Sequence, residues 1–176
     1  VSNIDTAVIV FSINSPKWDE LLVDLLILAC SANGIEPVLC LNKSDLATME
    51  DIDNIFRQYS KSGCKIVMTD AKHKNGLDEL KSILGGKITV FAGQSGAGKS
   101  TLINALTETD SMKTGLLSER IDRGKNTTRH CELLSFDSGY IADTPGFSKF
   151  DPSLLHPDSI KNMYKEFMPF NTMCRF

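Results

Sequence analysis

The residues of this sequence that are best suited to chemistry form a glycine-rich segment at positions 93–100. It reads Gly-Gln-Ser-Gly-Ala-Gly-Lys-Ser and fits the pattern G-x-x-x-x-G-K-[ST] without a mismatch. Glycines let backbone N–H groups curl around a phosphate, the lysine reaches the β- and γ-phosphates, and the hydroxyl binds Mg²⁺. We therefore predict a nucleotide phosphate site formed by Gly93, Gln94, Ser95, Gly96, Ala97, Gly98, Lys99, Ser100 and Thr101.

A second pattern, D-x-x-G, begins at Asp143, where a short apolar segment ends. An aspartate at the end of a core strand can hold Mg²⁺ together with Ser100. The N–H of Gly146 can contact a γ-phosphate, so that the loop after it responds to the nucleotide. ATP-binding transporter subunits need an LSGGQ-type segment and a strand ending in Asp-Glu, and the sequence has neither.

A third pattern, N-K-x-D at 42–45, is typical of guanine recognition. The Asp45 carboxylate can accept from N1–H and the exocyclic amine of guanine, which adenine cannot supply. The Asn42 side chain is expected to address N7, and the stem of Lys43 to pack along the base. Ala71 and Lys72 resemble part of a supporting Ser-Ala-Lys segment whose backbone N–H contacts guanine O6, although Asp70 stands where serine is usual.

The segments around these motifs alternate between apolar strands and helical patterns, which predicts an α/β fold with a mainly parallel sheet covered on both faces. Ser15 and Pro16 are expected to start the first helix, as N-cap and first helical residue, and Thr48 to cap the second. We expect strands at 7–13, 37–41, 65–69, 88–92, 131–136 and 140–142, and helices from 16 to about 33, 48–62, 77–84, 99–106 and 157–167.

Composition sets broad limits on what the chain can be. It has 176 residues, a formal net charge of −3 and 41% hydrophobic residues, which excludes a disordered chain and a strongly basic nucleic-acid-binding domain. No apolar run approaches the roughly 18 residues that a membrane helix needs, so no membrane association is expected. Five scattered cysteines without a C-x-x-C pair indicate a reducing compartment, and we expect a cytoplasmic protein.

The order of the motifs is unusual, because the guanine pattern precedes the phosphate loop. In this order the chain resembles the circularly permuted GTPases, and among them the RsgA family, also called YjeQ or YloQ. The resemblance rests on residues 93–100, 123–130 and 143–147 and on the final Cys-Arg-Phe. It implies a three-layer P-loop GTPase fold that binds GTP and GDP with Mg²⁺ and hydrolyses GTP to GDP and phosphate.

The same resemblance implies a longer protein with further domains. Members of the family carry an N-terminal OB-fold and a C-terminal zinc domain, whose first cysteine aligns with Cys174. We expect residues 1–168 to be the GTPase domain and 169–176 the start of the zinc domain, with Zn²⁺ bound only in the full-length protein. The implied partner is the small (30S) ribosomal subunit and its rRNA, contacted mainly through the flanking domains, in late maturation of that subunit. We expect a monomer.

Residues 107–130 are then the first switch, in which Thr127 or Thr128 is expected to reach Mg²⁺. Many GTPases place a water-orienting glutamine directly after D-x-x-G, but the residue here is Phe147. The family commonly has a histidine before the threonine pair, where this chain has Asn126. The candidates for a catalytic role are Asn126, Thr128 and His130, and we expect slow hydrolysis that a partner accelerates.

Three alternatives remain open at this stage. One is another permuted assembly GTPase with a different target. Another is a nucleotide-gated binding module with negligible hydrolysis, which Phe147 and Asn126 keep in view. The last is an ATPase, because a phosphate loop alone does not select a base.

Overall fold

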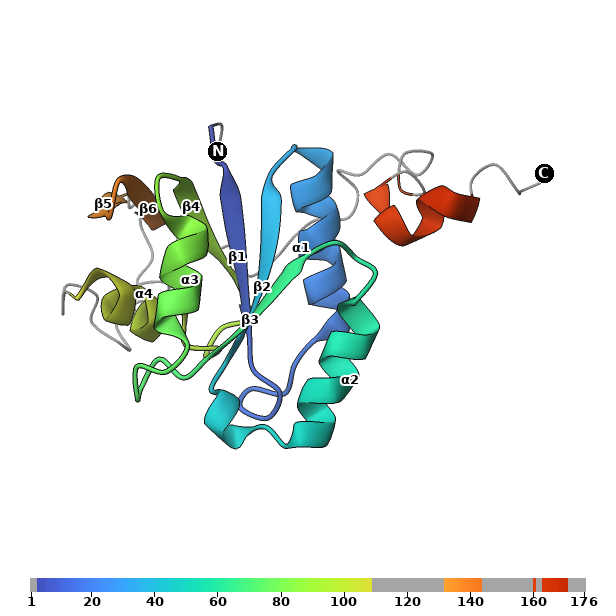
Figure 1. The fold of residues 1–176 in the computed structure, drawn as a ribbon, viewed down its shortest axis with the longest axis horizontal. Coiled ribbons are helices and arrows are strands. Elements are labelled where there is room, and N and C mark those ends of the chain that lie inside the picture. Colours follow the sequence, from blue (N-terminus) through green and yellow to red (C-terminus); the bar gives the residue numbers. More distant parts are fainter. Residues whose placement is uncertain (1–2, 109–131, 144–159, 161–162, 171–176) are drawn as a thin grey trace, which may run out of the picture.

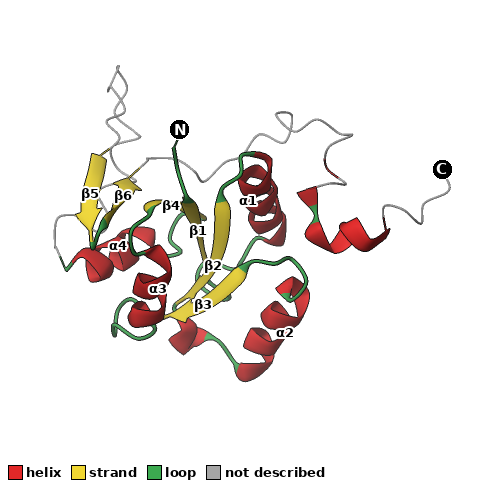
Figure 2. Cartoon of the chain, turned by 45° about the horizontal axis from the view of Figure 1, so that its top comes forward, coloured by secondary structure: helices red, strands yellow, loops and turns green. Residues whose placement is uncertain are grey.

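The computed structural model describes residues 3–108, 132–143, 160 and 163–170, and the side chains of Glu132 and Asp143 are not described. These residues form a six-stranded sheet in the order β3-β2-β1-β4-β6-β5. Helices α1 and α2 lie on one side of the sheet and α3 and α4 on the other (Figures 1 and 2). The predicted α/β class with three layers is confirmed.

Four strands form the parallel core of the sheet. They are β1 (Thr6–Phe11), β2 (Glu36–Asn42), β3 (Lys65–Thr69) and β4 (Ile88–Gly93), and β1 pairs with both β2 and β4. Strand β6 (Gly139–Asp143) continues the parallel set beside β4, and β5 (Glu132–Phe136) closes the edge as its antiparallel partner. Because these strands are parallel, the carboxyl ends of β2, β3, β4 and β6 lie along the same side of the sheet. The predicted motifs lie at or directly after these carboxyl ends.

The helices cover two separate apolar faces. Helices α1 (Glu20–Ala32) and α2 (Met49–Tyr59) pack on a cluster that includes Ile9, Leu39 and Leu41. Helices α3 (Leu77–Leu84) and α4 (Lys99–Thr107) pack on the opposite face, against side chains such as Val8 and Val38. Strands buried on both faces read as continuous apolar runs in the sequence, which explains why they were easy to predict.

Local signals set the helix starts, and one prediction is wrong. Thr48 caps α2 as expected, because its hydroxyl accepts from the Asp51 N–H while the Asp51 carboxylate accepts from the Thr48 N–H. Helix α1 does not begin at Ser15-Pro16. Its cap is Asp19, whose carboxylate accepts from the Leu22 N–H at 3.1 Å, and residues 14–17 form a turn closed by pairing of Asn14 with Lys17.

The helix predicted over 157–167 lies largely outside the described residues. Where the chain is described again, Lys165–Phe170 form a 3₁₀ helix, η3, rather than an α-helix. Pro169 lies inside η3, and a proline removes a backbone donor and disfavours the α conformation of the residue before it. Among the described helices, none has the length and apolar character needed to cross a bilayer.

Burial also settles the chemistry of two cysteines. Cys30 and Cys40 are free and buried, and loss of solvation raises the pKa of each thiol to about 12. Both are therefore protonated at neutral pH and unsuited to act as nucleophiles. Cys40 instead lies 3.3 Å from the Thr69 hydroxyl, in a buried polar chain that leads toward the site described below.

Leu80 and Leu133 provide a matched test of this core. Leu80 on α3 is fully buried, whereas Leu133 on the outer strand β5 is 58% exposed. We expect Leu80→Ala to lower the free energy of unfolding by about 2–5 kcal/mol and Leu133→Ala to change it by less than about 0.5 kcal/mol. Urea unfolding followed by circular dichroism measures both, and similar losses in the two variants would contradict the packing described.

Candidate nucleotide-binding site

The glycine-rich segment lies where β4 ends and α4 begins, as predicted. Gly93, Gly96 and Gly98 all have positive φ angles, of 125°, 80° and 95°. A Cβ on Gly93 would lie 2.0 Å from the backbone oxygen of Val10, so only glycine fits there. Gly98 occupies the N-cap position of α4 and no side chain caps that end, which leaves the first N–H groups of the helix available to an anion.

Lys99 is held inside this loop. Its Nζ donates to the carbonyl oxygens of Gly93 at 2.7 Å and Gln94 at 2.8 Å. Burial lowers the pKa of the Lys99 ammonium below its ordinary value, because the described residues around it supply carbonyl dipoles rather than a negative charge. The buried Oε1 of Gln94 has no hydrogen-bond partner within the part of the chain that the structure describes. A loop with a desolvated cation and free helix N–H groups suits a phosphate.

Asn42 joins the phosphate loop to the guanine motif. Its side chain is buried at the end of β2. Its Nδ2 donates to the Ala97 carbonyl at 2.9 Å, and its Oδ1 accepts from the Thr69 hydroxyl at 3.1 Å and the Ala71 N–H at 3.2 Å. One amide thus links the ends of β2, β3 and β4. The predicted contact of Asn42 with guanine N7 stays a prediction.

Lys43 makes a second link to the phosphate loop. Its backbone is left-handed, with φ 58°, and its Nζ donates to the Gly96 carbonyl at 2.9 Å and the Ser15 carbonyl at 2.6 Å. Sequence reasoning missed Ser15, because it acts through a backbone oxygen that leaves no mark on residue type. The turn predicted to start a helix is instead tied to the guanine motif through this bond.

Asp45 lies in a short 3₁₀ helix, η1 (Ser44–Leu46), and is exposed. The position of η1 is fixed by Asn14, whose Nδ2 donates to the Leu46 carbonyl at 2.7 Å. Asn14 was also missed, since an asparagine beyond a strand is usually a turn residue. The Asp45 carboxylate is therefore presented to solvent on an anchored turn, as a guanine-reading group requires.

The segment after β3 lies beside the N-K-x-D motif, to which it is joined through Asn42. Ala71 is buried and donates its N–H to Asn42, whereas Lys72 is exposed. Asp70 is buried beside them and pairs with His73. Burial alone would raise the pKa of the Asp70 carboxyl, but hydrogen bonds from the His73 ring and backbone, with the charge of that ring, outweigh it and hold the pKa below its ordinary value.

The expected Mg²⁺ ligands are described only in part. Ser100 lies in the first turn of α4, and Asp143 ends β6, which pairs with β4 through Val90 and Ala142. A serine in the first turn of α4 and an aspartate at the end of the neighbouring strand β6 are residue types whose oxygen ligands suit Mg²⁺. The remaining predicted residues lie outside the described part of the chain: Asn126, Thr127, Thr128, His130, Gly146 and Cys174.

Comparison with known proteins agrees with this geometry. A family model described as RsgA GTPase matches residues 1–153. The chain belongs to the RsgA GTPase family. It is 43% identical over 176 residues to a protein of Clostridium perfringens named small ribosomal subunit biogenesis GTPase RsgA, and 44% identical over 177 residues to a protein of the same name from Caldanaerobacter subterraneus. All of this chain is covered in both, but only 61% and 60% of the relatives.

Two solved structures of the family resemble the fold. YjeQ from Thermotoga maritima matches with a TM-score of 0.76 and 32% identity, over 95% of this chain and 56% of that one. YloQ, described as a circularly permuted GTPase, matches with a TM-score of 0.73 and 28% identity, over 99% of this chain and 55% of that one. The chain thus spans about three-fifths of the length of the curated relatives, and the permuted RsgA fold is confirmed.

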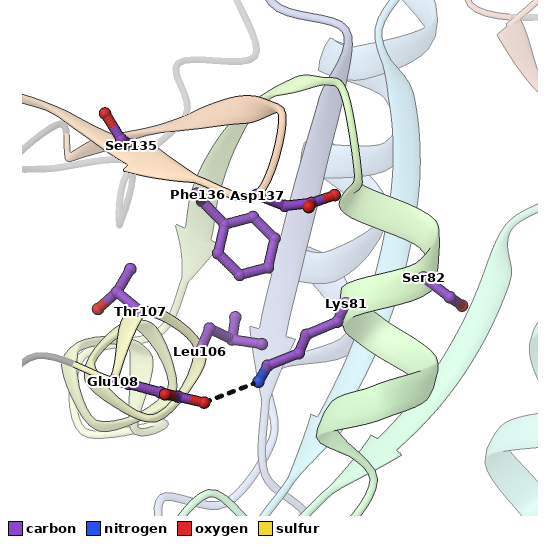
Figure 3. Close-up of a pocket in the computed structure, with 8 residues that line it drawn as sticks. All are labelled: Lys81, Ser82, Leu106, Thr107, Glu108, Ser135, Phe136 and Asp137. Carbon is purple, nitrogen blue, oxygen red and sulfur yellow. Dashed lines mark hydrogen bonds and ion pairs between the residues drawn. The ribbon is translucent and has the colours of Figure 1, made fainter.

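A cavity lies away from all of these motifs. It has a volume of about 460 Å³ and lies between α3, the end of α4 and the turn that joins β5 to β6 (Figure 3). Lys81 and Glu108, which both line it, form an ion pair at 3.4 Å, and Leu106 and Phe136 contribute apolar side chains to the same lining. Its one cation is already paired with an acid, so we assign no phosphate to it.

Gly98 and Gly34 allow the link through Asn42 to be tested. Both have positive φ angles, so alanine costs roughly 1 kcal/mol of strain at either. A Cβ on Gly98 would also lie 2.3 Å from the Asn42 Nδ2, whereas one on Gly34 would have no neighbour within 4 Å. We expect Gly98→Ala to weaken GDP binding at least about tenfold, because the Asn42 amide is displaced from its buried partners. Gly34→Ala should bind GDP as the wild type does, and equal affinities of the two variants in isothermal titration calorimetry would contradict the assignment.

Proposed function

We propose that this chain is the guanine-nucleotide-binding and GTP-hydrolysing domain of a factor that assists late maturation of the small ribosomal subunit. The observation that carries the proposal is the Asn42 amide, which bonds to Ala97 in the phosphate loop and to Ala71 beside the guanine motif. Curated relatives named small ribosomal subunit biogenesis GTPase support the biological role. Because the chain spans three-fifths of their length, activity and partner remain proposals.

The sheet suggests how the nucleotide lies. The base-reading groups follow β2 and β3, the phosphate loop follows β4, and β1 lies between β2 and β4. The base would rest on Asp45 and Ala71, and the phosphates on the start of α4. The turn at Ser15 is held between these ends by Lys43, so it would lie under the middle of the nucleotide.

The residues of the phosphate loop would stabilise charge during hydrolysis. A γ-phosphate would give the buried Lys99 ammonium a negatively charged partner. The first N–H groups of α4 would stabilise the same phosphate with their partial positive charge. When bound, Mg²⁺ would neutralise charge on the β- and γ-phosphate oxygens. Ser100 and Asp143 would hold it, with Thr127 or Thr128 from the first switch, and Gly146 would contact the γ-phosphate.

The residue that orients the attacking water is the catalytic group for which the sequence offers no standard candidate. Phe147 cannot do so, and the candidates Asn126, Thr128 and His130 lie in the first switch. We propose that hydrolysis by the domain alone is slow, and that the ribosomal subunit orders this switch and accelerates it. A GTPase that waits for its partner would couple hydrolysis to a completed assembly step.

Further parts of the proposal concern the whole protein. We assign residues 1–168 to the GTPase domain and 169–176 to the start of a zinc-binding domain, in which Cys174 would be one of several ligands and would bind no Zn²⁺ alone. Contacts with rRNA would come mainly from flanking domains, with a contribution from the basic excess of residues 113–130. We propose a monomer that acts in the cytoplasm.

Asp45 is the residue that tests the base assignment. Replacing it by asparagine sets an amide donor against the N–H groups of guanine and removes two charge-assisted hydrogen bonds, each worth about 1.5–3 kcal/mol. We expect Asp45→Asn to weaken GDP binding at least about a hundredfold and to improve binding of xanthosine diphosphate, which has a carbonyl oxygen in place of the exocyclic amine.

The matched control for this variant is Asp53→Asn, the same change at an exposed acid on α2. It should leave GDP affinity within about twofold of the wild type. Isothermal titration calorimetry with both nucleotides measures the preference. An Asp45→Asn protein that still prefers GDP over xanthosine diphosphate would show that Asp45 does not read the base.

GTP turnover tests the proposed activity and partner together. Phosphate release is measured for this chain and for the full-length protein, each with and without purified small ribosomal subunits. We expect slow release by both proteins alone and a clear acceleration of the full-length protein by the subunit. Large ribosomal subunits serve as the control. Fast turnover by this chain alone, or a full-length protein that does not respond to the small subunit, would refute the proposal.

A further inference from the structure

The carboxylate that is expected to read guanine has a second carboxylate beside it. One oxygen of Asp45, one oxygen of Asp70 and a ring nitrogen of His73 all lie within 4.8 Å of one another. The Asp70 side chain is only 6% exposed, whereas Asp45 is exposed. Two ionised carboxylates at this distance repel each other, and a buried one is unfavourable unless it is paired. The arrangement therefore needs a compensating group.

His73 makes the contacts that such a group would make. Its Nδ1 lies 2.5 Å from one oxygen of Asp70, and its backbone N–H donates to the other at 3.2 Å. The pKa of Asp70 lies below its ordinary value despite burial, because of these contacts and a hydrogen bond from the Lys72 backbone N–H. Asp70 thus stays ionised, and its negative charge persists beside Asp45.

No lysine forms an ion pair with this cluster among the residues that the structure describes. The Lys43 ammonium is bound to the carbonyls of Ser15 and Gly96. Lys72 and Lys74 are exposed, and in the described part of the chain neither forms an ion pair with Asp45 or Asp70. A nitrogen of the His73 ring lies within 4.8 Å of an oxygen of each carboxylate.

We propose that His73 is a positioning residue for guanine recognition: its ring balances the charge of Asp70 and holds the Asp45 carboxylate where it meets the base. Without the ring, Asp45, as the exposed member of the pair, is pushed away from Asp70 and out of line with the N–H groups of guanine. This inference rests on the proposed function, because it concerns how the same site selects its base.

A double-mutant cycle tests the inference in the wild-type chain. Isothermal titration calorimetry gives the affinity for GDP of the wild type, His73→Gln, Asp70→Asn and the double variant. We expect His73→Gln alone to weaken GDP binding about tenfold, which corresponds to about 1.4 kcal/mol. The double variant should return to within about threefold of the wild type, because the repelling carboxylate is then absent. Lys74→Gln, which removes a cation from the same loop, should change the affinity less than about twofold.

Two further measurements separate positioning from general damage. The loss in His73→Gln should be smaller for inosine diphosphate, which lacks the exocyclic amine that Asp45 is expected to bind. His73→Arg, which places a permanent cation beside Asp70, should retain the affinity for GDP within about threefold even if Asp70→Asn fails to fold. Circular dichroism melting checks that each variant is folded.

The outcomes separate this inference from the proposed function. A wild type that does not bind GDP, or an Asp45→Asn variant that binds it unchanged, overturns both. The inference alone fails if the wild type binds GDP but His73→Gln weakens binding equally in the wild-type and Asp70→Asn backgrounds. It also fails if His73→Gln does not weaken binding at all. If added Zn²⁺ weakens GDP binding by the wild type and not by His73→Gln, the cluster is a metal site and the inference fails.

Discussion

The side-chain amide of Asn42 is the interaction on which the rest of the site depends. Buried at the end of β2, it donates to the phosphate loop through Ala97 and accepts from Thr69 and Ala71 beyond β3. Each of these polar groups is removed from water, so the loss of one partner would leave another unsatisfied. The protein's own hydrogen bonds therefore fix the position of the base motif relative to the phosphate loop. Gly98 is required partly because a side chain there would collide with this amide.

The parallel sheet explains why the order of the motifs in the chain matters so little. A site built from the carboxyl ends of β2, β3, β4 and β6 requires these ends to lie on the same side of the sheet. Parallel pairing of the strands places them there, whichever strand comes first in the sequence. Here the base-reading strand comes first and the phosphate-binding strand later. Helix α1 joins β1 to β2 and helix α2 lies between β2 and β3, whereas α3 connects β3 to β4 on the other side of β1, so the order along the chain and the order in the sheet differ without loss of the pairing.

Features decided by neighbours in sequence could be predicted, whereas contacts between distant segments could not. The bounds of β3 follow from its short apolar run, α3 ends at Gly85, and Thr48 caps α2 through a partner three residues away. The start of α1 was misjudged because Asp19 competes with Ser15 as a local cap and prevails. The approach of His73 to Asp45, and the bond from Lys43 to Ser15, exist only after β1, β2 and β3 have paired, and nothing in the sequence near either residue announces them.

The packing of Trp18 makes the site observable without any label. It is the single tryptophan of the chain, and its ring centroid lies 5.2 Å from that of Phe11 and 5.8 Å from that of Tyr59. Its backbone N–H closes the turn that contains Ser15, whose carbonyl receives the Lys43 ammonium. Indole emission depends on the polarity and packing around the ring, so a displacement of this turn when nucleotide enters or leaves would change the intrinsic fluorescence of the protein.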